Sequence, residues 1–173
     1  MNGPDIEFDH IGIAVETVDK AKPFWAALGY ACEGPRETVT EQKVTVEMLP
    51  LRNNSNIELL EPLNESSTVA QFLKKRGPGI HHICLRVKNI DQILKDLKSK
   101  GIRLINETAV KGAHGARVAF VHPFSTGGVL VELSENSAHG KSASDQYVSD
   151  KAESGQSKSD QSKSDLAGRG THG

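Results

Sequence analysis

Two histidines and two glutamates stand at matching positions in the two halves of the chain. His10 is followed 48 residues later by Glu58, and His82 is followed 50 residues later by Glu132. Imidazole nitrogens and carboxylate oxygens together can hold a divalent ion while water or substrate fills the remaining positions. The four residues are therefore predicted to bind one divalent metal ion. Mixed ligands of this kind accept cobalt, zinc, manganese, nickel or magnesium.

The four positions belong to an internal repeat. FDHIGIAV, which begins at Phe8, aligns with IHHICLRV, which begins at Ile80, and the offset of 72 residues holds without a gap to Gly29 and Gly101. The halves also end alike, with IELLEP at 57–62 and VELSEN at 131–136. Such a long register rarely arises by chance, so each half is predicted to be one copy of the same unit.

Hydrophobic periodicity predicts the element order β-α-β-β-β in each copy. The alternating segments 8–15 and 80–87 are typical of strands that place the histidine on one face and aliphatic residues on the other. Glu58 and Glu132 each lie between aliphatic residues, so their carboxylates are expected on the histidine face. Helices are expected over 19–28 and 89–100, before glycines suited to a helix C-cap, and a connector helix over 66–76. The remaining strands are expected near 30–33, 42–49 and 56–60, and near 103–106, 116–122 and 129–133.

Each metal candidate also has a simpler interpretation. A lone histidine beside a strand is often hydrogen-bonded in a core, and carboxylates at strand ends are usually solvated. The matching positions in the repeat favour the metal site. His81 aligns with Asp9 and has the opposite strand parity, so it is not predicted to be a ligand. The four histidines without a partner in the repeat are not predicted ligands either: His114, His122, His139 and His172.

Composition narrows the function classes. The 173 residues carry 21 Lys and Arg against 22 Asp and Glu, a balance that does not favour nucleic acid or an anionic membrane as partner. No segment approaches the roughly 18 consecutive apolar residues of a membrane span. The acidic N-terminal segment is unlike a secretory signal, so the cytoplasm is the expected compartment. Cys32 and Cys84 are interpreted as ordinary buried thiols.

The last part of the chain differs from the rest. From about residue 135, Ser, Lys, Asp, Gly and Gln dominate, and QSKSD occurs twice in succession. Such a polar segment buries too little apolar surface to offset the entropy of ordering, so 135–173 is predicted to be a disordered tail. One ordered domain over 5–134 remains, with module one at about 5–62 and module two at about 80–134.

Six segments in order resemble the methylmalonyl-CoA epimerase family of the vicinal oxygen chelate superfamily. They are DHIGIAV, FWAALGY, IELLEPLNESSTVAQFL, GPGIHHICLRV, KGAHGARVAFVHP and GVLVEL. The resemblance covers about 5–134 and implies an α+β fold. In that fold, two tandem βαβββ modules form an open, cup-shaped β-barrel around one divalent metal ion, usually in a homodimer. The family's metal positions fall on the four residues that the repeat selects.

The resemblance implies an acyl-CoA substrate and an epimerase. The enzyme would interconvert (R)- and (S)-methylmalonyl-CoA by α-proton abstraction through a metal-stabilised enolate. Glu132 is the expected proton-transfer base, although it has an equal claim to be a ligand only, and Glu47 is a candidate partner base. Glycines in the loops 111–115 and 122–128 let backbone amides approach the substrate. The candidate substrate-binding residues are Lys111, Gly112, His114, Gly115 and Ser125. Lys111 and Arg86 are candidates for contact with CoA phosphates, or ordinary surface cations.

Three positions depart from the family pattern. Glu58 stands where many relatives have Gln, which makes the ligand set resemble that of glyoxalase I. Val46 occupies the position of a proposed catalytic Glu in some relatives, and Phe124 replaces the Lys of a frequent HPK sequence. Two alternatives therefore stay open: a glyoxalase I similar to lactoylglutathione lyase, and a non-catalytic protein of the same fold that binds small molecules.

Overall fold

The structure is a computed structural model that describes residues 5–30, 36–51 and 54–136. Module one contains β1 (Ile6–Ala14), α1 (Val18–Ala27), β2 (Glu37–Val39), β3 (Val44–Pro50) and β4 (Asn56–Pro62). The helix α2 (Thr68–Arg76) connects it to module two, which contains β5 (Gly79–Val87), α3 (Ile90–Ser99), β6 (Val110–Lys111), β7 (Arg117–Val121) and β8 (Val131–Glu135). Two short 3-10 turns, η1 (Ala113–Gly115) and η2 (Pro123–Ser125), flank β7.

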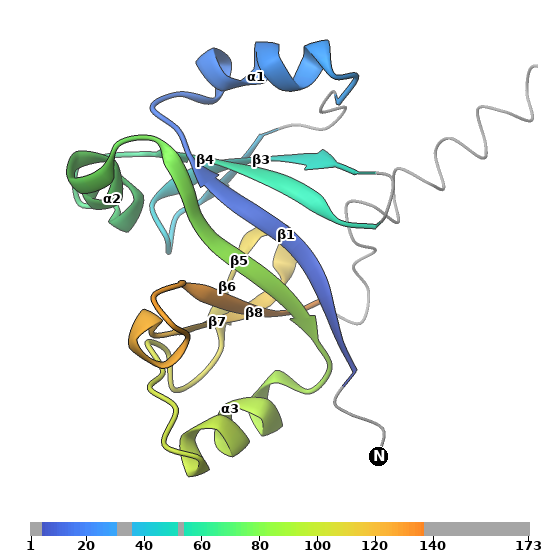
Figure 1. The fold of residues 1–173 in the computed structure, drawn as a ribbon, viewed down its shortest axis with the longest axis vertical. Helices are drawn as coiled ribbons and strands as arrows, with labels where there is room; N and C mark the ends of the chain where they lie inside the picture. Colours follow the sequence, from blue (N-terminus) through green and yellow to red (C-terminus); the bar gives the residue numbers. More distant parts are fainter. Residues whose placement is uncertain (1–4, 31–35, 52–53, 137–173) are drawn as a thin grey trace, which may run out of the picture.

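The strands form one strongly curved sheet in the order β2-β3-β4-β1-β5-β8-β7-β6 (Figure 1). β1 and β5 run antiparallel at its centre, β4 is parallel to β1, and β8 is parallel to β5. Gly12 lies opposite Glu58, and Cys84, which is the repeat equivalent of Gly12, lies opposite Glu132. The predicted α+β fold of two βαβββ modules is confirmed, and the two copies agree at the level of strand register.

Caps explain where the three helices begin and end. The side chains of Thr17, Ser67 and Asn89 each accept a hydrogen bond from a backbone N–H in the first turn of α1, α2 and α3, respectively. Gly29 and Gly101 adopt positive φ angles of 84° and 74° just after α1 and α3, as their predicted C-cap positions require. None of the described helices is long and apolar enough to cross a membrane.

The second strand of each module differs from the prediction. The predicted strand at 30–33 lies almost wholly outside the described residues, and the structure has β2 at 37–39 instead. The predicted strand at 103–106 is wrong, because only an isolated bridge from Leu104 to Val121 forms there. The Asn106 side chain accepts a hydrogen bond from the Phe120 backbone N–H, which takes the place of a regular ladder bond. The predicted tail lies outside the described residues from 137 onward, and Glu135 belongs to β8.

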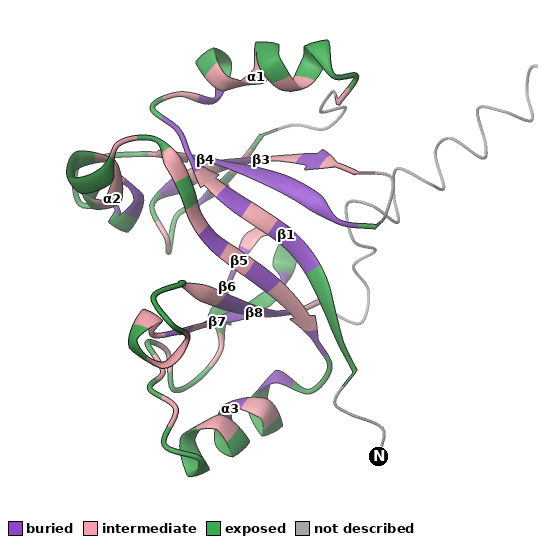
Figure 2. Ribbon diagram, viewed as in Figure 1, coloured by how far each residue is buried: buried purple, intermediate pink, exposed green. Residues whose placement is uncertain are grey.

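Three clusters of apolar side chains form the core of the protein. One lies between the outer face of module one and α1, and it includes Ile11, Ile13 and Val15 as the alternation predicts. A second lies between module two and α3. Buried residues are concentrated in the sheet, whereas the outer surfaces of α1 and α3 are exposed (Figure 2). The core therefore lies mainly where the helices cover the strands.

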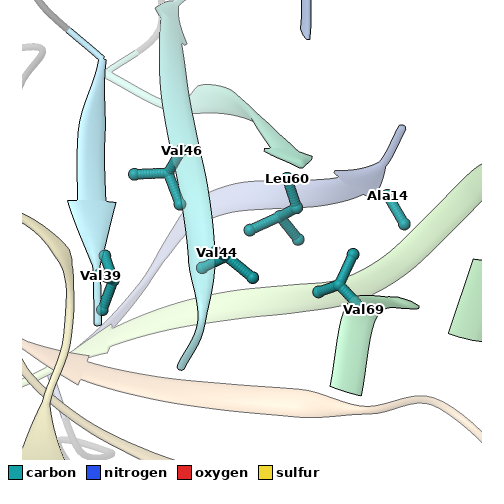
Figure 3. Close-up of a cluster of buried hydrophobic side chains, with 6 residues drawn as sticks. All are labelled: Ala14, Val39, Val44, Val46, Leu60 and Val69. Carbon is teal, nitrogen blue, oxygen red and sulfur yellow. The ribbon is translucent and has the colours of Figure 1, made fainter. Parts of the chain in front are cut away.

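The third cluster lies on the same face of the sheet as the histidines and glutamates. It consists of Ala14, Val39, Val44, Val46, Leu60 and Val69 (Figure 3). Leu60 follows Glu58 by two residues on β4, so strand alternation places both on one face. Val69 belongs to α2, whose Phe72 and Leu73 pack against the cluster. The connector helix thus covers the apolar part of this face, next to the polar residues.

Candidate metal centre

The four central strands each contribute one residue to a buried polar cluster, which we call the metal cluster. β1 positions His10, β4 positions Glu58, β5 positions His82 and β8 positions Glu132, and all four are no more than 7% exposed. These strands lie side by side in the middle of the sheet (Figure 1). Alternation turns all four side chains to the same face, away from the helices α1 and α3.

The separations between the polar atoms of the metal cluster are short. The Nε2 atoms of His10 and His82 are 3.2 Å apart. Oε2 of Glu58 lies 3.4 Å from Nε2 of His10 and 3.5 Å from Nε2 of His82. Oε2 of Glu132 lies 3.0 Å from Nε2 of His82. The structure therefore brings together all four residues that the repeat selected.

This donor set fits a divalent ion. Nitrogen and oxygen ligands lie about 2.0–2.2 Å from an ion such as Zn²⁺, so adjacent ligands of one ion are about 3.0–3.5 Å apart. The separations in the metal cluster fall in that range, and the ligand atoms of His10, Glu58 and His82 all lie within 4.8 Å of one another. Two imidazoles and two carboxylates would hold the ion and leave positions for substrate oxygens.

Cys84 is a neighbour of the metal cluster that the sequence did not single out as a ligand. It forms a second close group with His10 and Glu132, and it is fully buried, as predicted for a buried thiol. Burial and the negative charge of Glu132 raise the pKa of the Cys84 thiol to about 12. This raised pKa favours the protonated thiol when no metal ion is bound, and thiolate is the form that binds metals. The predicted Cys32 lies outside the described residues.

A second layer of contacts orients His10. Its Nδ1 donates to Oδ1 of Asp9 at 3.0 Å, which leaves Nε2 directed at the metal cluster. Arg86 in turn donates from Nε to Oδ2 of Asp9 at 2.8 Å. A register shift between Phe8 and His10 in the pairing of β1 with β5 interrupts the regular alternation here. Sequence reasoning missed Asp9, although its position directly before His10 is a usable signal, and Arg86 is paired with Asp9 rather than exposed for CoA phosphates.

Without a metal ion, the electrostatics of the metal cluster favour a proton on His10. Burial lowers the pKa of His10, but the charge of Glu58 and the hydrogen bond to Asp9 outweigh it and raise that pKa well above its ordinary value. Burial raises the pKa of Glu58, but the charge of His10 outweighs it, so that pKa is lowered. A metal ion would replace this proton with its own positive charge.

His81 and Gly12 frame the His82 ring. His81 lies outside both close groups of ligand atoms, and its ring packs against Phe72 at 5.0 Å between centroids. Burial, together with the charge of His82, lowers the pKa of His81 to about 4. On the other side, a Cβ added to Gly12 would lie 2.5 Å from Nδ1 and 2.7 Å from Nε2 of His82. Only glycine leaves room for the ring here.

Glu47, the predicted second base, is not part of the metal cluster. On β3 its neighbour Met48 lies opposite Glu58, so alternation turns Glu47 to the other face, toward α1. The Glu47 carboxylate is buried and pairs with Lys22 of α1 at 2.6 Å and with Arg36 at 2.9 Å. The sheet therefore separates Glu47 from the ligands, and this placement does not support proton transfer to a substrate bound there.

The predicted substrate-binding residues have different surroundings. Lys111 is exposed on β6, and Gly112 is buried with its Cα facing the Val118 side chain. The Ser125 hydroxyl accepts a hydrogen bond from the Arg103 backbone N–H at 2.9 Å. Gly115 has a φ of 72° in the η1 turn. His114 contacts module one, where its backbone N–H and its imidazole both face the Glu37 carboxylate.

Comparison with known proteins agrees with the fold. Residues 9–120 match the model of the Glyoxalase/Bleomycin resistance protein/Dioxygenase superfamily. The chain is 42% identical over 128 residues to the mitochondrial methylmalonyl-CoA epimerase of Bos taurus, and the match covers 73% of each chain. A crystal structure of methylmalonyl-CoA epimerase from Mycobacterium tuberculosis is similar with a TM-score of 0.71 and 39% identity, over 75% of this chain and 87% of that one.

A further solved structure carries a ligand. It is a methylmalonyl-CoA epimerase in complex with methylmalonyl-CoA and NH4+, similar with a TM-score of 0.71 and 34% identity, over 78% of this chain and 96% of that chain. The paired modules define a type of fold in which each module supplies half of a donor set that could hold a divalent ion. The chain belongs to the Glyoxalase/Bleomycin resistance protein/Dioxygenase superfamily and, within it, to the methylmalonyl-CoA epimerase family.

Proposed function

We propose that this chain catalyses the divalent-metal-dependent interconversion of (R)- and (S)-methylmalonyl-CoA. The observation that carries the proposal is the metal cluster itself. Equivalent strands of the two modules bring two His and two Glu side chains together, with four pairs of their polar atoms 3.0–3.5 Å apart. The relatives named as epimerases, one of them bound to methylmalonyl-CoA, supply the substrate class.

The chemistry required is the removal and return of one proton. The Cα–H of methylmalonyl-CoA lies between a thioester carbonyl and a carboxylate, which together make the proton acidic. The divalent ion, when bound, supplies the positive charge that stabilises the enolate. Glu132 has one oxygen beside His82, so its other oxygen is available to take the proton from Cα. Asp9 holds His10 in one orientation, which keeps the ligand set rigid.

The proposal includes the surroundings of the site. The loops with Lys111, Gly112, Gly115 and Ser125 are proposed to hold the acyl-CoA through their backbone amides and through the ammonium group of Lys111. We also propose a homodimer in the cytoplasm, without nucleic-acid or membrane partners. These points rest on the sequence and the resemblance, and size measurement in solution tests the dimer.

Proton NMR of methylmalonyl-CoA in deuterium oxide tests the activity. The α-proton signal of either epimer is expected to disappear with metal-loaded protein and to persist with metal-free protein. His82→Ala removes a ligand and should abolish the exchange, whereas Gln71→Ala, on the exposed side of α2, is the matched control. No exchange by fully metal-loaded protein would refute the proposal. Turnover of methylglyoxal with a thiol would then support glyoxalase I, and failure to bind metal would favour the non-catalytic alternative.

A further inference from the structure

One acid and histidine pair outside the metal cluster joins the two modules. Glu37 lies on β2, at one end of the strand order, and His114 lies in η1, beside β6 and β7 at the other end. Oε2 of Glu37 accepts a hydrogen bond from the His114 backbone N–H at 2.8 Å and lies 3.1 Å from Nδ1 of the same residue. Ala113 packs against the apolar cluster of Figure 3. The curvature of the sheet thus brings a loop of module two onto module one.

Strand register places Glu37 on the face of the metal cluster. Glu37 lies opposite Val46 on β3, and Val46 lies opposite Leu60 on β4. Residues directly opposite one another on neighbouring strands point to the same face. Leu60 shares that face with Glu58, two residues earlier. The Glu37 side chain therefore lies on the same face of the sheet as the metal cluster, next to Val46 on the neighbouring strand.

Glu37 holds His114 against the β2 edge of the sheet, whereas Glu132 belongs to β8, on the other side of the central strands β1 and β5. The charge of His114 is one of the causes that lower the pKa of Glu58, which agrees with the position of its partner Glu37 on the same face of the sheet. In the strand order, β2, β3 and β4 lie on one side of the central pair and β8 lies on the other. Because Glu37 holds His114 at the β2 edge, a substrate above the central strands would lie between His114 on that side and Glu132 on the β8 side.

The conformation of His114 suits acid–base chemistry. Its φ of 52° and ψ of 27° are in the left-handed region, which non-glycine residues adopt where the surroundings fix them. Glu37 supplies that constraint through two contacts. Among the described residues, Nε2 of His114 has neither a hydrogen bond nor an ion pair, while Nδ1 is held by a carboxylate. An imidazole oriented at one nitrogen by a carboxylate can exchange a proton at the other nitrogen.

We infer that His114 is the second proton-transfer residue of the epimerisation and that Glu37 is its positioning residue. This inference rests on the proposed function. In one direction, the Cα–H bond breaks, its electron pair enters the enolate, and Glu132 receives the proton. The imidazolium of His114 then delivers its Nε2 proton to the opposite face of Cα, where the enolate electrons form the new C–H bond. In the reverse direction the two residues exchange roles, and solvent restores both protonation states.

The test separates proton exchange from inversion with single epimers in deuterium oxide. His114→Asn suits the left-handed backbone but cannot transfer the proton. Epimerisation by this variant is expected to fall by about 10²- to 10⁴-fold. Exchange of the α-proton is expected to continue, with retention of configuration, for the one epimer whose proton faces Glu132. A structural defect or a loss of metal would slow exchange of both epimers together.

Two further variants keep the inference testable. His114→Gly also accommodates the positive φ, and added imidazole is expected to restore part of its epimerisation rate. Glu37→Gln keeps an acceptor for the His114 backbone N–H but loses the charge, so kcat should fall while KM changes little. Glu41→Gln, in the exposed turn after β2, is the matched control with wild-type rates.

The outcomes distinguish a failure of the role of His114 from a failure of the proposed function. Wild-type epimerisation by His114→Asn would overturn the role of His114 and leave the proposed function intact. A rise in KM alone, or equal loss of exchange for both epimers, would also overturn it, because His114 would then serve binding or folding. Absence of any exchange by the metal-loaded wild-type protein would instead refute the proposed function.

Discussion

Replacing Gly12 with alanine should displace the His82 ring, a proposed metal ligand, without replacing any ionisable residue. An added Cβ would lie 2.5 Å from Nδ1 and 2.7 Å from Nε2 of His82, with Cε1 closer still, whereas ordinary contacts begin at 3.4 Å. Nδ1 must therefore move by about 0.9 Å and Cε1 by more, which exceeds the tolerance of about 0.2 Å for ligand distances in a metal site. We expect the Kd for the metal to rise about 10- to 100-fold, comparable to the loss of a contact that orients a ligand. That change corresponds to about 1.4–2.8 kcal/mol.

Titration of metal-free protein with Co²⁺, followed by calorimetry or visible absorption, measures this change. Gly79→Ala is the matched control, because it makes the same substitution on β5 at a position with nothing within 4 Å of the added Cβ. Thermal melting of both metal-free variants checks that the fold is intact. If Gly12→Ala bound the metal as tightly as the wild type, the claim that His82 needs this space would be refuted.

Three further predictions concern protonation, burial and capping. The raised pKa of His10 favours a proton where the metal ion would bind, so the affinity for the metal should rise with pH, by about tenfold per pH unit, and level off above that pKa. Titrations with Co²⁺ at several pH values measure this change. An affinity that does not vary with pH would contradict it. Glu47→Gln should lower the free energy of unfolding by about 1–3 kcal/mol in urea denaturation, because the substitution removes the buried charge that pairs with two cationic side chains. Loss of epimerisation with unchanged stability would show instead that Glu47 is a base. Ser67→Ala should cost about 1 kcal/mol in the same assay through the lost cap of α2, and an unchanged midpoint would argue against that cap.

The sequence alone determined the repeated architecture and the composition of the metal cluster. The register between His10 and His82, and between Glu58 and Glu132, needs only strand alternation and a repeat of the same unit to place four donors on one face. Local signals also determined the helix ends, since caps act within a few residues of the chain. The weakest expectations were the second strands of the two modules, where side-chain hydrogen bonds such as that of Asn106 compete with strand pairing.

Only the tertiary structure decided which residues gather around the metal cluster. Strand alternation together with the position of α1 turned Glu47 to the far face, where Lys22 and Arg36 pair with it. The pairing of Glu37 with His114 joins positions 77 residues apart, and it depends on the curvature of an eight-stranded sheet, which no local pattern encodes. The close approach of Gly12 to His82 has the same origin, because the distance between two strands is set by packing and not by either segment alone.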